Sequence, residues 1–152
     1  MQLQSYLDRM GVWYHLSHHA KTYTAADLAE SEHISGDRVI KPVLVNADGR
    51  FVLCALPASY RIDLNRLREM LHADAIGLAD ENKLAEMFPD CEVGAEPPIG
   101  FLYGLSTLMD ENLCKDERVT FQAGSHEAAV TMRMEDYRRI AQPEVGRFGR
   151  HI

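Results

Sequence analysis

The segment RVIKPVLVNADGRFVLCAL, residues 38–56, carries the clearest fold signal in the chain. Residues 38–46 are apolar and β-branched, which predicts a strand, and the ADG triplet at 47–49 is typical of a hairpin turn. The returning strand, residues 51–56, is apolar at every position. We therefore expect a β-hairpin whose second strand is covered on both faces.

Helix and strand signals continue on both sides of this hairpin. Gly11 ends a short helix, and Thr24, Asp63 and Asp80 each stand where a helix N-cap is expected. The predicted elements are helices at 2–10, 24–33, 64–71, 81–88 and 135–140, and strands at 12–18, 75–79, 118–124 and 128–134. This order predicts a mixed α/β (α+β) fold with a mixed sheet. We expect a single domain over residues 1–152, with its core at about 12–141 and a weakly structured tail at 142–152.

Composition limits the class of protein. The chain has 152 residues, 46% of them hydrophobic, which suits one domain with a sizeable core. The net charge of −7 argues against a generally basic nucleic-acid-binding surface, but leaves room for a small basic pocket. The first ten residues lack the apolar stretch of a signal peptide, and the longest apolar run, residues 51–58, is too short to span a bilayer. We expect a cytoplasmic protein without membrane contact.

Cysteine and histidine usage gives no sign of a metal or a disulfide framework. The three cysteines are widely spaced and form no CxxC pair. His15, His18 and His19 lie close together in sequence, but no cysteine or carboxylate pattern accompanies them. We expect surface histidines, and neither a metal nor a cofactor.

Lys41 stands among valines on the first hairpin strand. With strand alternation it shares a face with Val39, Val43 and Val45. One interpretation is a lysine at a strand edge that extends to water. The other is an ammonium group in a pocket, where it would bind an anion or a developing oxyanion. Pro42 cannot donate to a β-ladder, which predicts an edge position or a bulge here.

Residues 92–104, EVGAEPPIGFLYG, contain three glycines and two adjacent prolines. Glycine allows close approach and positive φ, whereas proline holds the backbone rigid. The stretch is either a plain connecting loop or a preorganised cradle that offers backbone N–H and C=O groups to a ligand.

A second tight turn, QAGSH at 122–126, separates two predicted strands. It is either an ordinary hairpin turn or a pocket rim that carries Ser125 and His126. Spacing alone cannot establish a catalytic triad. Asp110 is expected to be a turn or capping residue, with a ligand role as the alternative.

Taken together and in this order, the motifs resemble the YbaK/EbsC family, relatives of the editing domain of bacterial prolyl-tRNA synthetase. The resemblance runs from about Tyr14 to Ile140 and rests on VIKPVLV, LPASYRIDLNRL, GAEPP, LMDENL and AGSH. GAEPP matches the family's GxxxP pattern as Gly94 to Pro98. The resemblance implies a curved mixed sheet surrounded by helices. It also implies hydrolysis of the ester between a wrong, small amino acid and the 3′ end of a tRNA, with proline tRNA as the expected identity.

The same resemblance implies the site residues. Lys41 matches the lysine that the family needs for activity. The implied substrate-binding residues are Gly94, Ala95, Glu96, Pro97, Pro98, Gly100, Gly124, Ser125 and His126, with Tyr23 and Asp110 as secondary candidates. Many relatives carry a small polar residue after the lysine, where this chain has Pro42, and this puts the amino-acid specificity in question.

Two other functions fit the same residues. The chain could be a non-catalytic module that binds a nucleotide or an aminoacyl-adenosine end, or a regulatory partner of an aminoacyl-tRNA synthetase. The expected partners are the acceptor end of a mischarged tRNA and, in addition, a synthetase; we expect a monomer. Five arginines toward the C-terminus would form either a basic strip or a solvated face: Arg133, Arg138, Arg139, Arg147 and Arg150.

Overall fold

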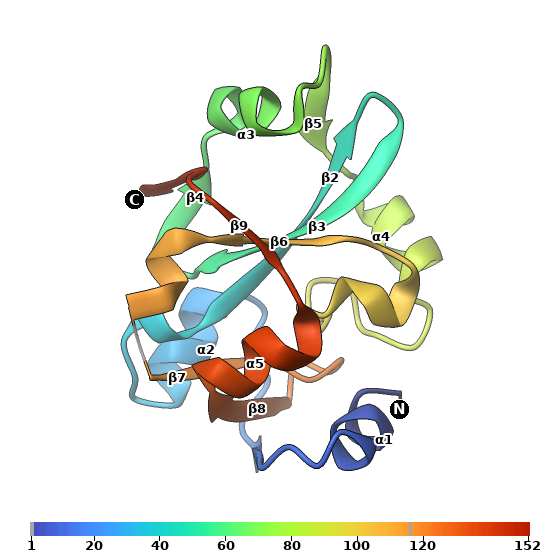
Figure 1. Cartoon of the computed structure of the whole chain (residues 1–152). Helices are drawn as coiled ribbons and strands as arrows, with labels where there is room; N and C mark the ends of the chain where they lie inside the picture. Colours follow the sequence, from blue (N-terminus) through green and yellow to red (C-terminus); the bar gives the residue numbers. More distant parts are fainter. Residues whose placement is uncertain (1, 116) are drawn as a thin grey trace.

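The computed structural model describes residues 2–115 and 117–152 and contains a mixed sheet with helices around it (Figure 1). The largest sheet has the strand order β5-β2-β3-β6-β9, a second sheet has the order β1-β8-β7, and β10 pairs with β4. The strands are β1 (His15–His18), β2 (Ile40–Ala47), β3 (Arg50–Pro57), β4 (Tyr60–Ile62), β5 (Ile76–Leu78), β6 (Thr107–Asp110), β7 (Arg118–Gln122), β8 (Ala128–Arg133), β9 (Glu144–Gly146) and β10 (Gly149–His151). The predicted mixed α/β class is confirmed, because antiparallel and parallel pairs occur in the largest sheet.

The predicted hairpin is the centre of the largest sheet. β2 and β3 pair antiparallel from Ile40↔Pro57 to Ala47↔Arg50. Asp48 and Gly49 make the turn, both with positive φ, as a tight hairpin turn requires. Residues 52–57 are buried, which confirms that both faces of β3 are covered. Apolar clusters accordingly meet both faces of β3: Ala55 belongs to one and Leu53 to a second, while Cys54 and Leu56 belong to a third.

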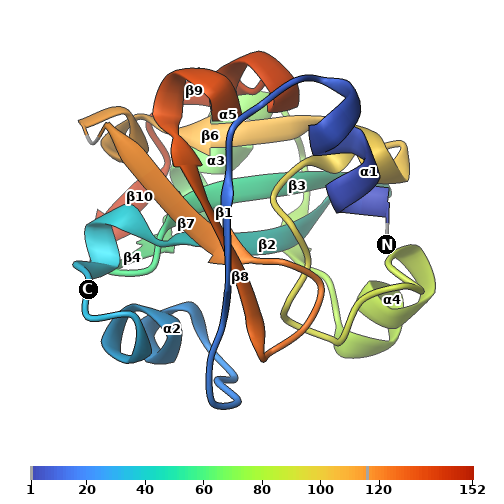
Figure 2. The same cartoon turned by 90° about the horizontal axis from the view of Figure 1, so that it is seen from below.

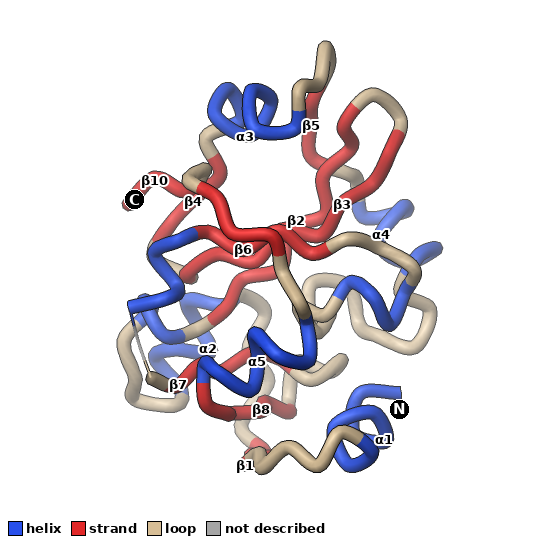
Figure 3. Tube along the Cα trace, viewed as in Figure 1, coloured by secondary structure: helices blue, strands red, loops and turns tan. Residues whose placement is uncertain are grey.

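The helices lie outside the sheets (Figure 3). They are α1 (Gln2–Arg9), α2 (Ala25–Ser31), α3 (Leu64–Leu71), α4 (Glu81–Met87) and α5 (Met134–Ala141). The three predicted N-caps are confirmed: Thr24, Asp63 and Asp80 each accept a backbone N–H from the first turn of their helix. Such a cap stabilises a helix by about 1 kcal/mol. Within the described residues, no helix is long and apolar enough to cross a membrane.

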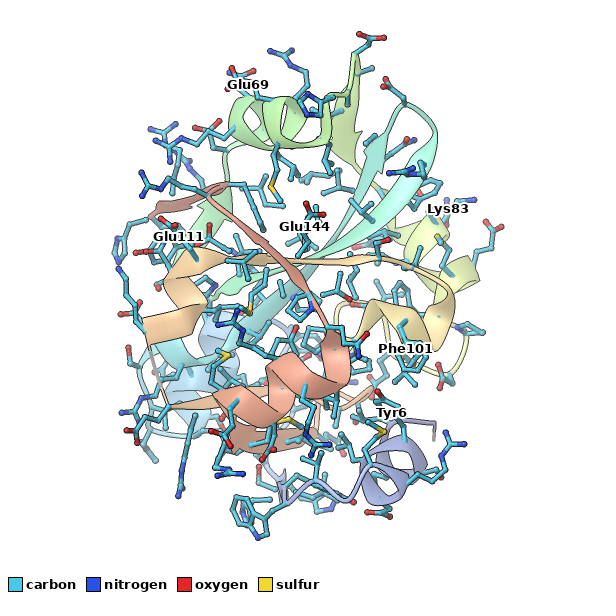
Figure 4. All side chains as sticks on the ribbon, in the orientation of Figure 1. Tyr6, Glu69, Lys83, Phe101, Glu111 and Glu144 are labelled. Carbon is cyan, nitrogen blue, oxygen red and sulfur yellow. The ribbon has the colours of Figure 1, made fainter. Side chains whose placement is uncertain are left out.

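The N-terminal helix is part of the main core. Leu3 and Leu7 are fully buried, and the hydroxyl of Tyr6 donates to the carbonyl oxygen of Ile140 at 2.7 Å. The rings of Tyr6 and Phe101 also meet, with centroids 5.1 Å apart (Figure 4). α1 therefore packs against both α5 and the C-terminal part of residues 92–104, which we call the glycine–proline loop.

The C-terminal segment differs from the prediction of a weakly structured tail. β9 runs parallel to β6, and β10 pairs antiparallel with β4. Phe148 between them is fully buried in the cluster under α3. The prediction was wrong because a proline, three-residue strands and two glycines give little local strand signal, whereas the pairing partners lie tens of residues away.

Asp110 at the end of β6 holds this C-terminal segment in place. Its Oδ1 accepts the backbone N–H groups of Phe148 at 3.1 Å and of Gly149 at 2.8 Å. Oδ2 accepts both the backbone and the side-chain N–H of Asn112. The expected turn or capping role of Asp110 fits these contacts, and its carboxylate is fully occupied by them.

Candidate functional site

The glycine–proline loop and the QAGSH turn are fastened to each other. The backbone N–H of Glu92 donates to Gly124 O at 2.9 Å, and the N–H of Gly124 donates to Ala95 O at 2.8 Å. Nε2 of His126 lies 2.8 Å from the carbonyl oxygen of Val93. The structure thus brings together two groups of predicted site residues that lie some thirty positions apart in sequence.

Glycine is required at two points of this junction. Gly94 has φ +90° and Gly124 has φ +86°, a backbone region that other residues rarely adopt. A Cβ on Gly94 would point toward Cε1 of His126 and the carbonyl oxygen of Tyr23, at 3.6 and 3.8 Å. Gly94 therefore marks the place where the loop, the turn and the segment before α2 meet.

Most of the loop is less accessible than the cradle interpretation requires. Among its predicted binding residues, Gly94 is exposed, whereas residues 95–100 are buried. Several carbonyl oxygens have internal donors: that of Pro97 accepts from Ile99 N–H, and that of Pro98 accepts from the Tyr137 hydroxyl at 2.6 Å. The expectation that free backbone groups are held ready along the whole loop is not met. A ligand that approaches this loop meets Gly94 and its exposed neighbours first.

Gly100 lies at the buried end of the loop. A Cβ there would come within 2.8 Å of both Leu105 O and Thr107 Oγ1. The same hydroxyl accepts the N–H of Gly100 at 2.8 Å. The missing side chain at this position is explained by packing against the start of β6.

Glu96 is a buried carboxyl group inside the loop, with only 2% of its surface exposed. Its Oε1 accepts the N–H of Gly94 at 2.8 Å, which fixes the turn around that glycine. Burial raises the pKa of this carboxyl, while hydrogen bonds from the backbone and the charge of nearby His126 act in the opposite direction.

The segment before α2 forms a further wall. Thr22 is buried, and its N–H donates to the carbonyl oxygen of His126 at 2.8 Å. Tyr23 is 64% exposed, and its ring lies 5.5 Å from the His126 ring. Nζ of Lys21 lies 5.5 Å from the centre of the Tyr23 ring. An aromatic surface with a cation over it therefore stands beside Gly94 and His126.

Lys41 lies on a part of β2 that has a partner strand on only one side. Residues 45–47 of β2 pair with β5, but Lys41 and Pro42 pair with β3 alone. The edge position that Pro42 predicted is confirmed. Lys41 is half-buried, and its Nζ donates to the carbonyl oxygen of Tyr60. Burial lowers the pKa of this ammonium group. The Lys41 side chain is thus neither fully exposed to water, as the first interpretation requires, nor enclosed in a pocket, as the second requires.

Val39, just before β2, forms a parallel bridge with Thr120 of β7. Figure 2 shows the ribbon of β7 reaching the start of β2. Beyond the bridge β2 pairs with β3, and β7 continues to pair with β8. Lys41 and Gln122 are each two residues past the bridge in the same direction. Since side chains of an extended strand return to the same face every second residue, these two side chains flank the space where β2 and β7 separate.

Gln122 is a site residue that the sequence analysis did not single out. Its side chain is 3% exposed, and its Nε2 lies 3.4 Å from Thr22 O and 3.5 Å from Thr22 Oγ1. Its Oε1 is buried without a hydrogen-bond partner among the described residues, and so is Nδ1 of His126. The signal that could have indicated it is its position directly before the AGSH motif, at the end of the strand RVTFQ.

Other predicted residues have local roles. Ser125 Oγ accepts the N–H of Glu127 at 3.1 Å, which is the bond of an ordinary turn. Nδ1 of His19 lies 2.7 Å from the carbonyl oxygen of Ala20. Among the side chains that the structure describes, no three His, Cys, Asp or Glu residues gather as metal ligands would.

The five C-terminal arginines do not make one strip. Arg133 and Arg139 both pair with Asp136 on α5. Arg147 instead pairs with Glu111 at 2.6 Å, and Arg150 lies on β10. Acidic neighbours therefore neutralise much of this positive charge, which favours the interpretation of a solvated face.

Comparison with known proteins identifies relatives for most of the chain. Residues 19–140 match the family model described as the aminoacyl-tRNA editing domain. The multifunctional Ser/Thr-tRNA deacylase ProXp-y of Escherichia coli (strain K12) is 32% identical over 106 residues, which are 69% of this chain and 63% of that protein. A proline–tRNA ligase of Geobacillus thermodenitrificans (strain NG80-2) is 29% identical over 87 residues, which cover 57% of this chain and 15% of the ligase.

Solved structures share the fold at low sequence identity. A candidate trans-editing enzyme for prolyl tRNA synthetase superposes with a TM-score of 0.84 at 18% identity, covering 98% of this chain and 95% of the other. A hypothetical protein superposes with a TM-score of 0.89 at 18% identity, over 99% of this chain and 100% of the other. These similarities concern the fold, and they agree with the mixed α/β architecture described above.

Proposed function

Because the chain belongs to the family of aminoacyl-tRNA editing domains, we propose that it is an aminoacyl-tRNA deacylase that acts in trans. It hydrolyses the ester that joins a wrong amino acid to the 3′-terminal ribose of a tRNA. The observation that supports this most directly is Lys41, a half-buried ammonium group on the part of β2 that does not pair with β5.

The chemistry requires little from the protein. A water oxygen adds to the ester carbonyl, the carbonyl oxygen becomes an oxyanion, and the bond to the ribose oxygen then breaks. One proton of the water goes to the ribose oxygen, the other is released to solvent, and the amino acid leaves as a carboxylate. Lys41 uses one N–H on Tyr60 and has two more to donate to the oxyanion. Electrostatic stabilisation of this kind typically contributes a factor of ~10²–10³ in rate.

The exposed ring of Tyr23 supplies a surface for the terminal adenine. Aromatic side chains stack with any base, at about 1–3 kcal/mol per base. Gly94, which has no side chain, lets the ribose and the ester come close to the backbone beside this ring. The position of Tyr23 next to His126 and Gly94 supports its inclusion among the substrate-binding residues.

The relatives suggest the substrate. ProXp-y is a Ser/Thr-tRNA deacylase, and another relative is a proline–tRNA ligase. We therefore place serine and threonine first among the small amino acids, and proline tRNA first among the acceptors. The enzyme is expected to act as a cytoplasmic monomer on the acceptor end, with an aminoacyl-tRNA synthetase as a further partner.

The test is single-turnover deacylation of proline tRNA charged with serine, threonine, alanine or cysteine. We expect at least one ester to be cleaved, and we expect Lys41→Met to lower that rate ~10²–10³-fold. Methionine keeps most of the side-chain volume, and Lys83→Met, at a partly buried position on α4, is the matched control. If no ester is cleaved while charged tRNA still binds, the protein is a binding module and the deacylase proposal is wrong.

A further inference from the structure

Gln122 has a buried carbonyl oxygen with no partner. The residue is 3% exposed, and Oε1 has no hydrogen bond to any described group. A buried acceptor without a donor is unfavourable, and such groups are uncommon in folded proteins. A ligand that supplies the missing donor would remove this cost.

The orientation of the amide is determined by Thr22. Nε2 faces the carbonyl oxygen of Thr22, which can only accept a hydrogen bond. Rotating the amide by 180° would place two carbonyl oxygens against each other. Thr22 itself is held by its N–H bond to His126 O. In this orientation the carbonyl oxygen of Gln122 is an acceptor on the side of the amide that faces away from Thr22.

The strand register places Gln122 and Lys41 at equivalent positions on neighbouring strands. The bridge Val39↔Thr120 leaves Lys41 and Gln122 at equivalent positions on the two strands that separate beyond it. A group between them meets an ammonium on one side and a neutral acceptor on the other. A second ammonium would be repelled by Lys41 in this half-buried setting, whereas a hydroxyl is a neutral donor and would not be.

We propose that Gln122 Oε1 accepts a hydrogen bond from the side-chain hydroxyl of the substrate amino acid. Gln122 is then the residue that makes the site prefer serine and threonine over apolar amino acids of equal size. This inference rests on the proposed function, since it names the part of the same substrate that Gln122 reads. A site that hydrogen-bonds a substrate hydroxyl discriminates strongly against the analogue that lacks it.

The experiment compares serine with 2-aminobutyrate, in which a methyl group replaces the hydroxyl. Binding of 3′-serylamino-3′-deoxyadenosine and of its 2-aminobutyryl counterpart is measured by calorimetry, because these amides resist hydrolysis. Deacylation of the two corresponding esters on proline tRNA is measured in parallel. Gln122→Met is the test variant, and Gln4→Met on α1 is the control.

We expect the native protein to favour the seryl compound by about 10-fold or more, the scale of one hydrogen bond to a buried acceptor. In Gln122→Met this preference should fall to near one, with 2-aminobutyryl binding unchanged and the melting temperature preserved. If Gln122→Met binds both compounds more weakly by the same factor, Gln122 contacts the shared part of the ligand or supports the fold, and the inference is wrong. A native protein without preference also overturns it.

The two proposals fail in different ways. If neither ester is hydrolysed but the binding preference is lost in Gln122→Met, the deacylase proposal is wrong and Gln122 still reads the hydroxyl. If the esters are hydrolysed without a preference that depends on Gln122, the deacylase stands and the inference on Gln122 is wrong.

Discussion

Replacing Asp110 by alanine should loosen the C-terminal strand. The carboxylate is fully buried and accepts the N–H groups of Phe148 and Gly149, which are themselves buried. Alanine leaves both amides without an acceptor, at about 1–3 kcal/mol each, so we expect a loss of about 2–6 kcal/mol. Since a domain of this kind is stable by about 5–15 kcal/mol, this is a large part of the total.

The conservative substitution separates the hydrogen bonds from the charge. Asparagine keeps an acceptor at the Oδ1 position, but its amide would face the two N–H donors of Asn112. Asp110→Asn should therefore lose about 1–2 kcal/mol, less than the alanine variant. Asp74→Ala, at an exposed position after α3, is the control and should change stability by less than about 0.5 kcal/mol.

Urea unfolding gives these free energies, and amide hydrogen exchange locates the change. In Asp110→Ala, the amide exchange rates of Phe148, Gly149 and β10 should increase more than those of β3. If Asp110→Ala unfolds at the same urea concentration as Asp74→Ala, the carboxylate does not hold the C-terminal segment, and this account of Asp110 is refuted.

Two further substitutions test the loop. Glu96→Gln keeps the acceptor for the Gly94 N–H but cannot ionise. The pKa of Glu96 is raised in the folded state, so the stability that the native Glu96 side chain contributes is lost as the pH rises from about 4.3 through that raised pKa. The free-energy difference between Glu96→Gln and the native protein, measured by urea unfolding between pH 4 and 8, should therefore increasingly favour the variant as pH rises, and a pH-independent difference would contradict the assignment. Gly100→Ala places a Cβ 2.8 Å from Leu105 O, so it should lower the free energy of unfolding by about 1–3 kcal/mol; a melting temperature equal to that of the native protein would show that the loop can shift.

The features of the fold that the sequence determined by itself are those that depend on local interactions. The hairpin at residues 38–56 follows from β-branched runs around a turn, and the caps at Thr24, Asp63 and Asp80 follow from side chains that bond within one helical turn. Such features depend on neighbours only a few residues away, so composition and spacing predict them. The motifs around Lys41 and Gly94 are also short stretches of sequence, and their resemblance to the family can be recognised without a structure.

Only the tertiary structure decided how the site is assembled. The glycine–proline loop, the QAGSH turn and the segment before α2 are joined through His126. The bridge Val39↔Thr120 places Gln122 and Lys41 at equivalent positions on two strands that are distant in sequence. The burial of residues 95–100 and the pairing of the C-terminal strands likewise depend on long-range partners. A residue's accessibility and the state of its hydrogen bonds are properties of the packed chain. No local pattern in the sequence specifies which buried oxygen is left without a donor.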